Sequence, residues 1–268
     1  MKELFLDHNI GFDEYITGNR LIDICDITGA SFCKTDFLNE YADKKTKLLI
    51  THNSDYPIDE ARFSYLSKKV DRWLAQNKSV DSKAIESLPI GLENMILRVS
   101  PSSRLGTHSS QIPNAIEKAK YIDHLSAQKI NHDKLVYLNI NPRTYRHERE
   151  YVINKFKDKE WSTYESGITW REYYDRIARH KFVFSPRGNG IDCHRTWEAL
   201  YLRTIPIVKS SICMNDFSDL PILFINNWDE IGYDFLVEKY EEISSTKYDL
   251  SKLKISYWRK YIESLIDE

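Results

Sequence analysis

The chain has 268 residues, with 38 Lys and Arg against 40 Asp and Glu, and a formal net charge of −2 at pH 7. This balance excludes a protein that binds nucleic acid over its whole surface, and the 41% share of apolar residues excludes a disordered chain. The length allows one large domain or two of about 130 residues, each able to bury a core.

The apolar stretch within the first eight residues is too short for a signal peptide and is followed too closely by a charged residue. No run of about 18 apolar residues occurs. The four cysteines form no C-x-x-C pair, which is typical of reduced thiols in a cytoplasm. We therefore expect a soluble, cytoplasmic protein with no membrane span.

Short apolar runs alternate with helical patterns, which favours βα units and mainly parallel sheets. In the first half, residues 47–51 run into the polar group at 52–55. Such polar loops at the carboxyl ends of parallel strands are where ligands bind in open α/β sheets. The elements expected in this half are strands at 2–6, 21–24, 47–51, 70–74 and 95–99, a loop at 88–93, and a helix from 113 to about 125.

A polar stretch at 126–134 has no strong pattern, and we place a domain boundary there, giving domains 1–128 and 129–268. Thr169 and Glu172 have the spacing of a capping box, which predicts a helix start, and Asn227 with Glu230 repeats it. The other elements expected are strands at 135–140, 181–185, 205–208 and 220–225, and helices at 194–202 and 253–266.

The segment 180–208 reads as strand, glycine-containing turn, helix and strand. Gly188 and Gly190 allow the backbone to approach a ligand closely, and the helix that follows presents the positive end of its dipole. Arg187 adds a permanent cation that can bind phosphate oxygens in a bidentate manner. The pattern indicates an anion site, most naturally for a diphosphate, with an ordinary turn as the alternative.

Two common nucleotide motifs are missing. The sequence contains neither the P-loop G-x-x-x-x-G-K-[ST] nor the G-x-G-x-x-G fingerprint, so a nicotinamide enzyme is a poor fit. It also contains no Asp-x-Asp and no Cys/His cluster with zinc spacing. We therefore expect no bound metal, because Arg187 and the helix terminus supply the positive charge.

Three motifs carry a family resemblance: P-R-G at 186–188, R-x-x-E-A-L at 195–200 and I-P-I-V at 205–208. Together they resemble the signature of the exostosin-like glycosyltransferases, whose GT-B fold has two Rossmann-type domains facing across a cleft. The match covers about thirty residues and is nearest to small soluble members from bacteria and large algal viruses, some of which use UDP-xylose.

The resemblance implies an inverting glycosyltransferase that moves a sugar from a UDP-sugar to a hydroxyl of a glycan acceptor. Xylose is one candidate for that sugar. Domain 1–128 would then be the acceptor side, and domain 129–268, with its terminal helix, would bind the nucleotide sugar. No cofactor, metal or nucleic-acid partner is implied, and a virus-encoded member would work in the host cytoplasm. The alternatives are an inactive nucleotide- or glycan-binding module of the same fold and a Rossmann-type enzyme acting on a phosphorylated metabolite.

The resemblance also implies roles at the donor site. Arg187 would neutralise the diphosphate as it leaves, and Glu198 would accept hydrogen bonds from the ribose hydroxyls. Arg195 would bind phosphate or pair with an acid, and a packing role for Cys193 is the alternative to a ligand contact. The full set of expected donor-binding residues is Ser185, Arg187, Gly188, Asn189, Gly190, Asp192, Cys193, His194, Arg195 and Glu198, with Arg143 and Arg146 of the basic run that ends at Arg149.

That basic run has a spacing of three, so a solvated helix face is its alternative interpretation. Tyr164 and Glu165 are further candidates for contacting the nucleotide base.

The acceptor hydroxyl must lose its proton to a carboxylate or His at the end of a strand in the first domain. Asp55 and His52, which follow the strand at 47–51, meet this requirement, and Asp55 is our first choice. Glu93 is a further candidate, with Asp7 and His8 as rivals. A hydrogen-bonded loop residue is the alternative interpretation of His52.

Overall fold

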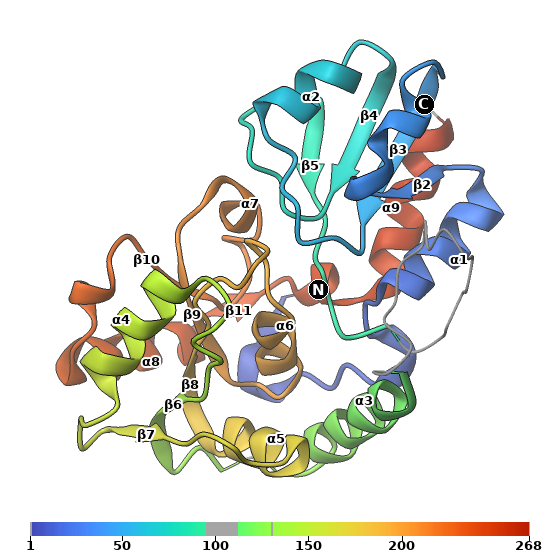
Figure 1. Ribbon diagram of the computed structural model, residues 1–268. Helices are drawn as coiled ribbons and strands as arrows, with labels where there is room; N and C mark the ends of the chain where they lie inside the picture. Colours follow the sequence, from blue (N-terminus) through green and yellow to red (C-terminus); the bar gives the residue numbers. More distant parts are fainter. Residues whose placement is uncertain (1, 95–111, 130, 268) are drawn as a thin grey trace.

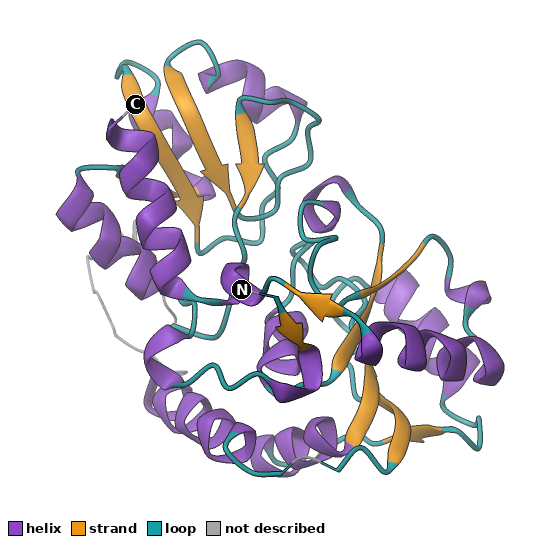
Figure 2. Ribbon diagram, turned by 180° about the vertical axis from the view of Figure 1, so that it is seen from behind, coloured by secondary structure: helices purple, strands orange, loops and turns teal. Residues whose placement is uncertain are grey.

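The structure is a computed structural model that describes residues 2–94, 112–129 and 131–267. It contains two parallel sheets flanked by helices, so the predicted α/β class is confirmed. Figure 1 and Figure 2 show the sheets in two separate lobes that meet near the middle of the molecule. This arrangement is consistent with a GT-B-like fold. The predicted strand at 95–99 lies outside the described residues.

The first lobe is built on a parallel sheet in the spatial order β2-β3-β4-β5. The predicted strands at 47–51 and 70–74 are confirmed as β3 and β4. Both outer strands were missed, because each is too short to show an apolar pattern. The elements of this lobe are β2 (Ser31–Lys34), β3 (Thr46–His52), β4 (Val70–Ala75), β5 (Ile85–Ser87), α1 (Gly18–Thr28), α2 (Glu60–Leu66) and the 3-10 helices η2 (Phe12–Glu14) and η3 (Thr35–Tyr41).

The predicted strand at 21–24 is wrong, because these residues lie inside α1. The side chain of Thr17 caps the helix by accepting a hydrogen bond from the backbone N–H of Arg20, and Gly29 ends it with a left-handed φ of 78°. Leu21, Ile24 and Cys25 are buried at a spacing of three and four. That spacing places their side chains on one helix face rather than on alternate faces of a strand.

The second lobe is built on a parallel sheet in the spatial order β10-β9-β8-β6-β7. All four strands predicted in this half are present, although the strand expected at 220–225 is shortened at its start. The strands are β6 (Lys134–Leu138), β7 (Ser162–Tyr164), β8 (His180–Phe184), β9 (Ile205–Lys209) and β10 (Leu223–Ile225). The helices are α3 (Ile112–Ser126), α4 (Arg146–Phe156), α5 (Trp170–Arg179), α6 (His194–Tyr201), α7 (Ile212–Asn215), α8 (Tyr233–Ser245) and the 3-10 helix η4 (Trp228–Glu230).

Both predicted capping boxes are confirmed. The hydroxyl of Thr169 accepts from the backbone N–H of Glu172, whose carboxylate accepts from the Thr169 N–H, at the start of α5. The same reciprocal pair joins Asn227 and Glu230 at η4. Each box satisfies N–H groups that have no partner within the helix.

The chain crosses between the lobes near both ends. The terminal helix α9 (Ile255–Asp267), which follows the 3-10 helix η5 (Leu250–Leu253), packs on α1 and β3 of the first lobe, as Figure 1 shows. Conversely, α3 precedes the predicted boundary at 128 yet packs against α5 and α6 of the second lobe. The helices α9 and α3 thus each pack on the lobe opposite to the one that a division at 128 would assign them. The division into domains 1–128 and 129–268 stays a prediction.

The predicted strand at 2–6 is only partly present. Strand β1 (Glu3–Leu4) pairs antiparallel with β11 (Lys247–Tyr248), and the 3-10 helix η1 (Phe5–Asp7) follows directly. Among the described residues, no helix is long and apolar enough to cross a membrane.

Candidate functional site

The second sheet reverses its strand order between β6 and β8. The chain passes from β6 to β7 at one edge, then returns to β8 on the other side of β6 and continues through β9 to β10. Loops that leave such a switch point diverge to opposite faces of the sheet, and ligands bind in the crevice between them. The two loops here are 139–145 and 185–193, and the second contains the predicted anion-binding turn.

The predicted turn is closely packed from both lobes. A Cβ added to Gly190 would lie 2.9 Å from Asn77 Nδ2 of the first lobe, and one added to Gly188 would lie 3.0 Å from Arg149 Nη2. A side chain at Gly190 would displace the buried Asn77, and one at Gly188 would press on the Arg149 guanidinium by a few tenths of an ångström. The two glycines therefore allow the turn to pack closely against both neighbours.

Arg149 holds the turn from beneath. Its Nε donates to the carbonyl of Arg187 at 2.8 Å, and its Nη2 lies 3.4 Å from the carbonyl of Pro186. Its Nη1 donates to the carbonyl of Asn141 at 3.1 Å and to the hydroxyl of Thr144. Only 6% of Arg149 is exposed. One buried guanidinium thus joins the two loops that leave the switch point.

The guanidinium of Arg187 lies on the crevice side of the turn. It stacks over the ring of Tyr145 at 4.1 Å and donates to the carbonyl of Asn189 at 3.1 Å. Arg195, on the first turn of α6, has a buried Nε without a hydrogen-bond partner. Arg195 is not without a counter-charge, because Glu198 on the same helix acts on it electrostatically and Tyr173 contacts its side chain. Arg149 and Arg187, in contrast, contact carbonyl oxygens, and no ion pair among the described residues joins either of them to a carboxylate.

The predicted ribose ligand Glu198 is already bonded. Its two carboxylate oxygens accept from the hydroxyls of Tyr173 at 3.1 Å and Tyr174 at 2.8 Å, and only 8% of the residue is exposed. Burial, reinforced by the nearby Glu198 charge, raises the pKa of both tyrosines well above the usual value. A ribose contact by Glu198 stays a prediction, and it would require a tyrosine hydroxyl to share its oxygen.

Asp192 faces the first lobe, where its carboxylate accepts from the backbone N–H of Ile90 at 2.7 Å and from the indole N–H of Trp197 at 2.9 Å. Its own N–H donates to Oδ1 of Asn77, whose Nδ2 donates to the carbonyl of Ser54. Burial raises the pKa of Asp192 to about 6. This network joins the donor loop to the ends of β3 and β4.

Three other predicted donor residues pack within the turn or against the first lobe. The hydroxyl of Ser185 bonds that of Thr196 at 2.9 Å, and Sγ of Cys193 lies 3.6 Å from the carbonyl of Pro186. Nδ1 of His194 lies 2.7 Å from the carbonyl of Gly91 in the first lobe.

The basic run divides differently from expectation. Arg143 and Arg146 are exposed, and Arg146 pairs with Glu150 one turn further along α4 at 2.7 Å. Arg149, the third member of the run, is the residue that reaches the turn. Spacing within the run marks all three equally. The signal that separates Arg149 is the apolar face of α4, because Val152, Ile153 and Phe156 lie three, four and seven residues after it and are buried with it.

Of the predicted catalytic residues, Asp55 is the one that faces the donor turn. Its Oδ2 accepts from Nδ2 of Asn189 at 3.3 Å, and both residues are exposed. Glu93 instead pairs with Lys118 of α3 at 2.9 Å. Both positions are part of the lobe contact, but only Asp55 contacts the loop that carries Arg187.

His52 and His8 are buried, each 1% exposed. Nδ1 of His52 lies 2.9 Å from Oδ1 of Asn53, and its Nε2 lies 3.1 Å from the carbonyl of Pro89. Burial lowers the pKa of both histidines, that of His8 to about 4. The structure favours a hydrogen-bonded packing role for His52, although the residue ends β3 and does not lie in a loop.

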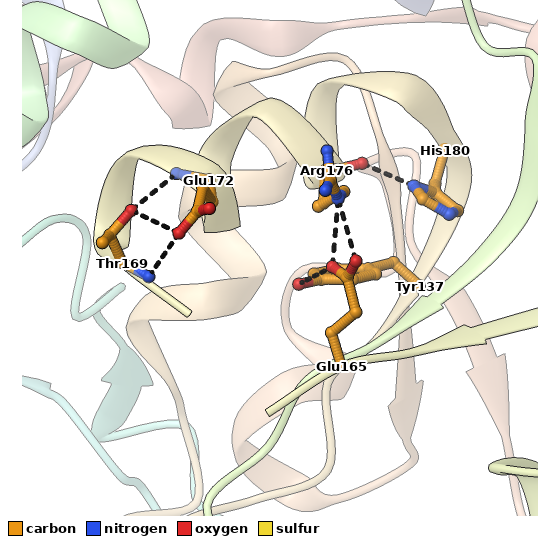
Figure 3. Close-up of polar contacts among 6 residues, drawn as sticks. All are labelled: Tyr137, Glu165, Thr169, Glu172, Arg176 and His180. Atoms are coloured by element: carbon orange, nitrogen blue, oxygen red, sulfur yellow. Dashed lines mark hydrogen bonds and ion pairs between the residues drawn. The ribbon is translucent and has the colours of Figure 1, made fainter. Parts of the chain in front are cut away.

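Glu165 lies in a separate polar cluster shown in Figure 3. Its carboxylate accepts from Nε of Arg176 at 3.0 Å and from the hydroxyl of Tyr137 at 3.3 Å. Nearby, Nδ1 of His180 bonds the carbonyl of Arg176. These contacts tie β6 and the end of β7 to α5, so Glu165 supports the edge of the switch point; contact with a base stays a prediction.

No group of three or more His, Cys, Asp and Glu among the described residues is placed to hold a metal ion. Metal independence of the reaction stays a prediction.

Comparison with known proteins points to the second lobe. The family model for the RXYLT1 C-terminal domain matches residues 140–267, a little under half of the chain. The matched segment includes Arg149, Arg187, Arg195 and Glu198. The chain is therefore similar, over its second lobe, to a xylosyltransferase-related family.

Among solved structures, the crystal structure of the GtfA/B complex aligns with 86% of this chain and 55% of that chain, at 12% identity and a TM-score of 0.36. This chain thus spans just over half the length of that structure's chain. A likeness this weak carries no argument about activity.

Proposed function

We propose that the protein is an inverting glycosyltransferase that moves a sugar from a UDP-sugar to a hydroxyl of a glycan. The observation that carries the proposal is the convergence of Arg149, Arg187 and Arg195 at the switch point, where no ion pair among the described residues joins Arg149 or Arg187 to a carboxylate. A diphosphate supplies the missing negative charge. Similarity of the second lobe to a xylosyltransferase-related family supports a sugar nucleotide over other diphosphates and makes xylose the first sugar to test.

In this proposal the diphosphate lies against the turn at 185–193. As the bond between the sugar's anomeric carbon and the phosphate oxygen breaks, negative charge grows on the leaving UDP. Arg187 and the N-terminus of α6 stabilise that charge, and they are already in place before the reaction. Arg149 fixes the backbone of the turn, so Arg187 need not reorganise. In this proposal the arginines supply the positive charge that a metal ion supplies in other transferases.

The acceptor hydroxyl attacks the anomeric carbon from the face opposite UDP, which inverts the configuration. Its oxygen forms the new bond to the sugar, and its proton passes to a base. Asp55 is suited to this role because it reaches the donor turn from the first lobe and is open to solvent. We expect His52 to be less suited to this role, because it is buried and both ring nitrogens already have hydrogen-bond partners.

Replacing Asp55 with Asn tests the base. We expect kcat for UDP release from UDP-xylose or another accepted UDP-sugar to fall by about 10²–10⁴-fold, because a neutral amide cannot take the proton. UDP affinity should stay near that of wild type, since Asp55 contacts Asn189 and not the arginines. Asp81→Asn, at an exposed carboxylate of the same lobe, is the matched control. Wild-type kcat in Asp55→Asn would rule out this residue as the base.

A binding module without activity predicts a different outcome. Wild-type protein would then bind UDP, and no UDP-sugar would be turned over at any acceptor concentration.

A further inference from the structure

A second concave region lies in the first lobe, beside Asp55. Strands β2 and β3 run parallel, with Lys34 opposite His52. The segments that follow them, η3 and the loop leading to α2, therefore leave the same edge of the sheet. Between them is a groove of about 820 Å³. It is lined by Thr35, Asp36, Leu38, Asn39, Tyr56, Asp59, Ala61, Arg62 and Tyr65.

Two exposed tyrosine rings line this groove. Tyr56 and Tyr65 are each 54% exposed, which is high for aromatic side chains beside a concave surface. The guanidinium of Arg62 lies 5.3 Å from the centre of the Tyr56 ring and holds it in place. Exposed, fixed aromatic rings offer apolar faces against which the C–H groups of a sugar ring can pack.

The charges along the groove are balanced. Asp59 pairs with Arg62 at 2.6 Å, and Asp36 lies 3.7 Å from the ammonium of Lys34. A polyanion would meet carboxylates without gaining a free cation, whereas paired polar groups can exchange hydrogen bonds with neutral hydroxyls. The lining therefore suits an uncharged, hydroxyl-rich ligand.

We propose that this groove binds a neutral oligosaccharide and is the acceptor site of the transferase. The inference rests on the proposed function for its link to the reaction. Tyr56 follows Asp55 directly, and Asp55 contacts Asn189 of the donor turn at 3.3 Å. An oligosaccharide lying along the groove thus has one end beside the base and the donor.

The acceptor is longer than one sugar. Tyr65 is the sixth residue of α2, so about 8 Å of helix separates it from the helix start near Asp59. The groove volume also lies in the upper part of the range of about 300–1,000 Å³ found for ligand clefts. Tyr56 contacts the unit nearest Asp55, and Tyr65 contacts a unit further from the reacting hydroxyl.

The test is binding of wild-type protein and single variants to an array of neutral and acidic oligosaccharides. Wild type should bind neutral chains of several units, and Tyr65→Ala should weaken that binding at least tenfold. Tyr233→Ala, which removes a tyrosine that is also 54% exposed but lies at the start of α8, should bind as wild type does. Arg187→Ala should retain glycan binding, because Arg187 lies outside the groove.

Each outcome decides one claim. Equal binding by wild type and Tyr65→Ala, no binding to any glycan, or a preference for acidic chains would overturn the groove as a neutral acceptor site. Glycan binding that depends on Tyr65, in a protein that does not bind UDP, would support the groove and defeat the proposed transferase activity. A change of UDP affinity in Tyr65→Ala would show that the variant disturbs the whole molecule, and the proposed separation of the two sites would be wrong.

Discussion

Arg149→Met should destabilise the protein by about 3 kcal/mol, which corresponds to a fall in Tm of about 6–12 °C. Methionine keeps the apolar stem but leaves the part-buried carbonyl of Arg187 and the buried carbonyl of Pro186 without their donor. Each unsatisfied buried acceptor costs about 1–3 kcal/mol. Because the turn also loses its support, we expect UDP to stabilise this variant much less than wild type. Thermal unfolding with and without UDP measures both effects.

Arg146→Met is the matched control, one turn earlier on the same helix. Arg146 is exposed, and its ion pair among the described residues is with the partly exposed Glu150, so its loss should change stability by no more than about 0.5 kcal/mol. An Arg149→Met protein as stable as this control would contradict the role of Arg149. A buried cation without a counter-charge can itself destabilise a protein. A Tm of Arg149→Met above that of wild type would therefore show that Arg149 serves phosphate binding and does not stabilise the turn.

The stability of the protein should fall steeply between pH 6.5 and pH 4. Burial lowers the pKa of His8, His132 and His180 from 6.5 to about 4, and that of His52 in the same direction. Unfolding lets each imidazole take up a proton in this window, so the unfolded state gains stability as the pH falls. These contributions are fully present above pH 6.5 and are lost towards pH 4.

Asp192 acts in the opposite direction. Burial raises its pKa from 3.8 to about 6, so the folded state holds an extra proton between these values and gains stability as the pH falls. One such proton against the three histidines whose pKa falls to about 4 leaves a net uptake of up to about two on unfolding, and His52 acts in the same direction as the other histidines. The expected slope from these groups is up to about 3 kcal/mol per pH unit near the middle of the window.

Denaturant unfolding across this pH range measures the slope. His8→Gln should reduce it by up to one proton, because His8 is 1% exposed. His147→Gln, at an exposed position on α4, should leave it unchanged. A free energy of unfolding that stays constant from pH 7 to pH 5 would contradict the burial of these histidines as neutral groups.

The sequence predicts the second lobe better than the first. In the segment 180–208, strand, turn and helix are each long enough to show their own pattern, and all are confirmed. In the first lobe, the apolar run at 21–24 looked like a short strand. The signals that decide otherwise, Thr17 and Gly29, lie four residues before it and five after it, outside a strand-sized window.

The donor site could be predicted only in part, because the decisive contacts are tertiary. Spacing within the basic run treats Arg143, Arg146 and Arg149 alike. Arg149 is the one on the buried face of α4, and its contact with the carbonyl of Arg187 appears only in the structure. The sequence predicts that Glu198 contacts a ligand, and it gives no sign that the hydroxyls of two tyrosines of α5 donate hydrogen bonds to its carboxylate. The opposition of Asp55 and Asn189, in contrast, follows from a general rule. Both lie in loops at the carboxyl ends of parallel strands, and those ends face each other here.

The proposed donor site is tested most directly by thermal unfolding with UDP, GDP, CMP and NAD, on wild type, Arg187→Ala and Arg259→Ala. A ligand at about a hundred times its Kd adds about 2.7 kcal/mol, which raises Tm by about 5 °C or more at this size. We predict that UDP shifts wild type and the control Arg259→Ala, which replaces an exposed arginine of α9, that the other ligands shift neither by as much, and that Arg187→Ala loses the UDP shift. No shift with UDP, or an equal shift in Arg187→Ala, would contradict a UDP-sugar site at the turn.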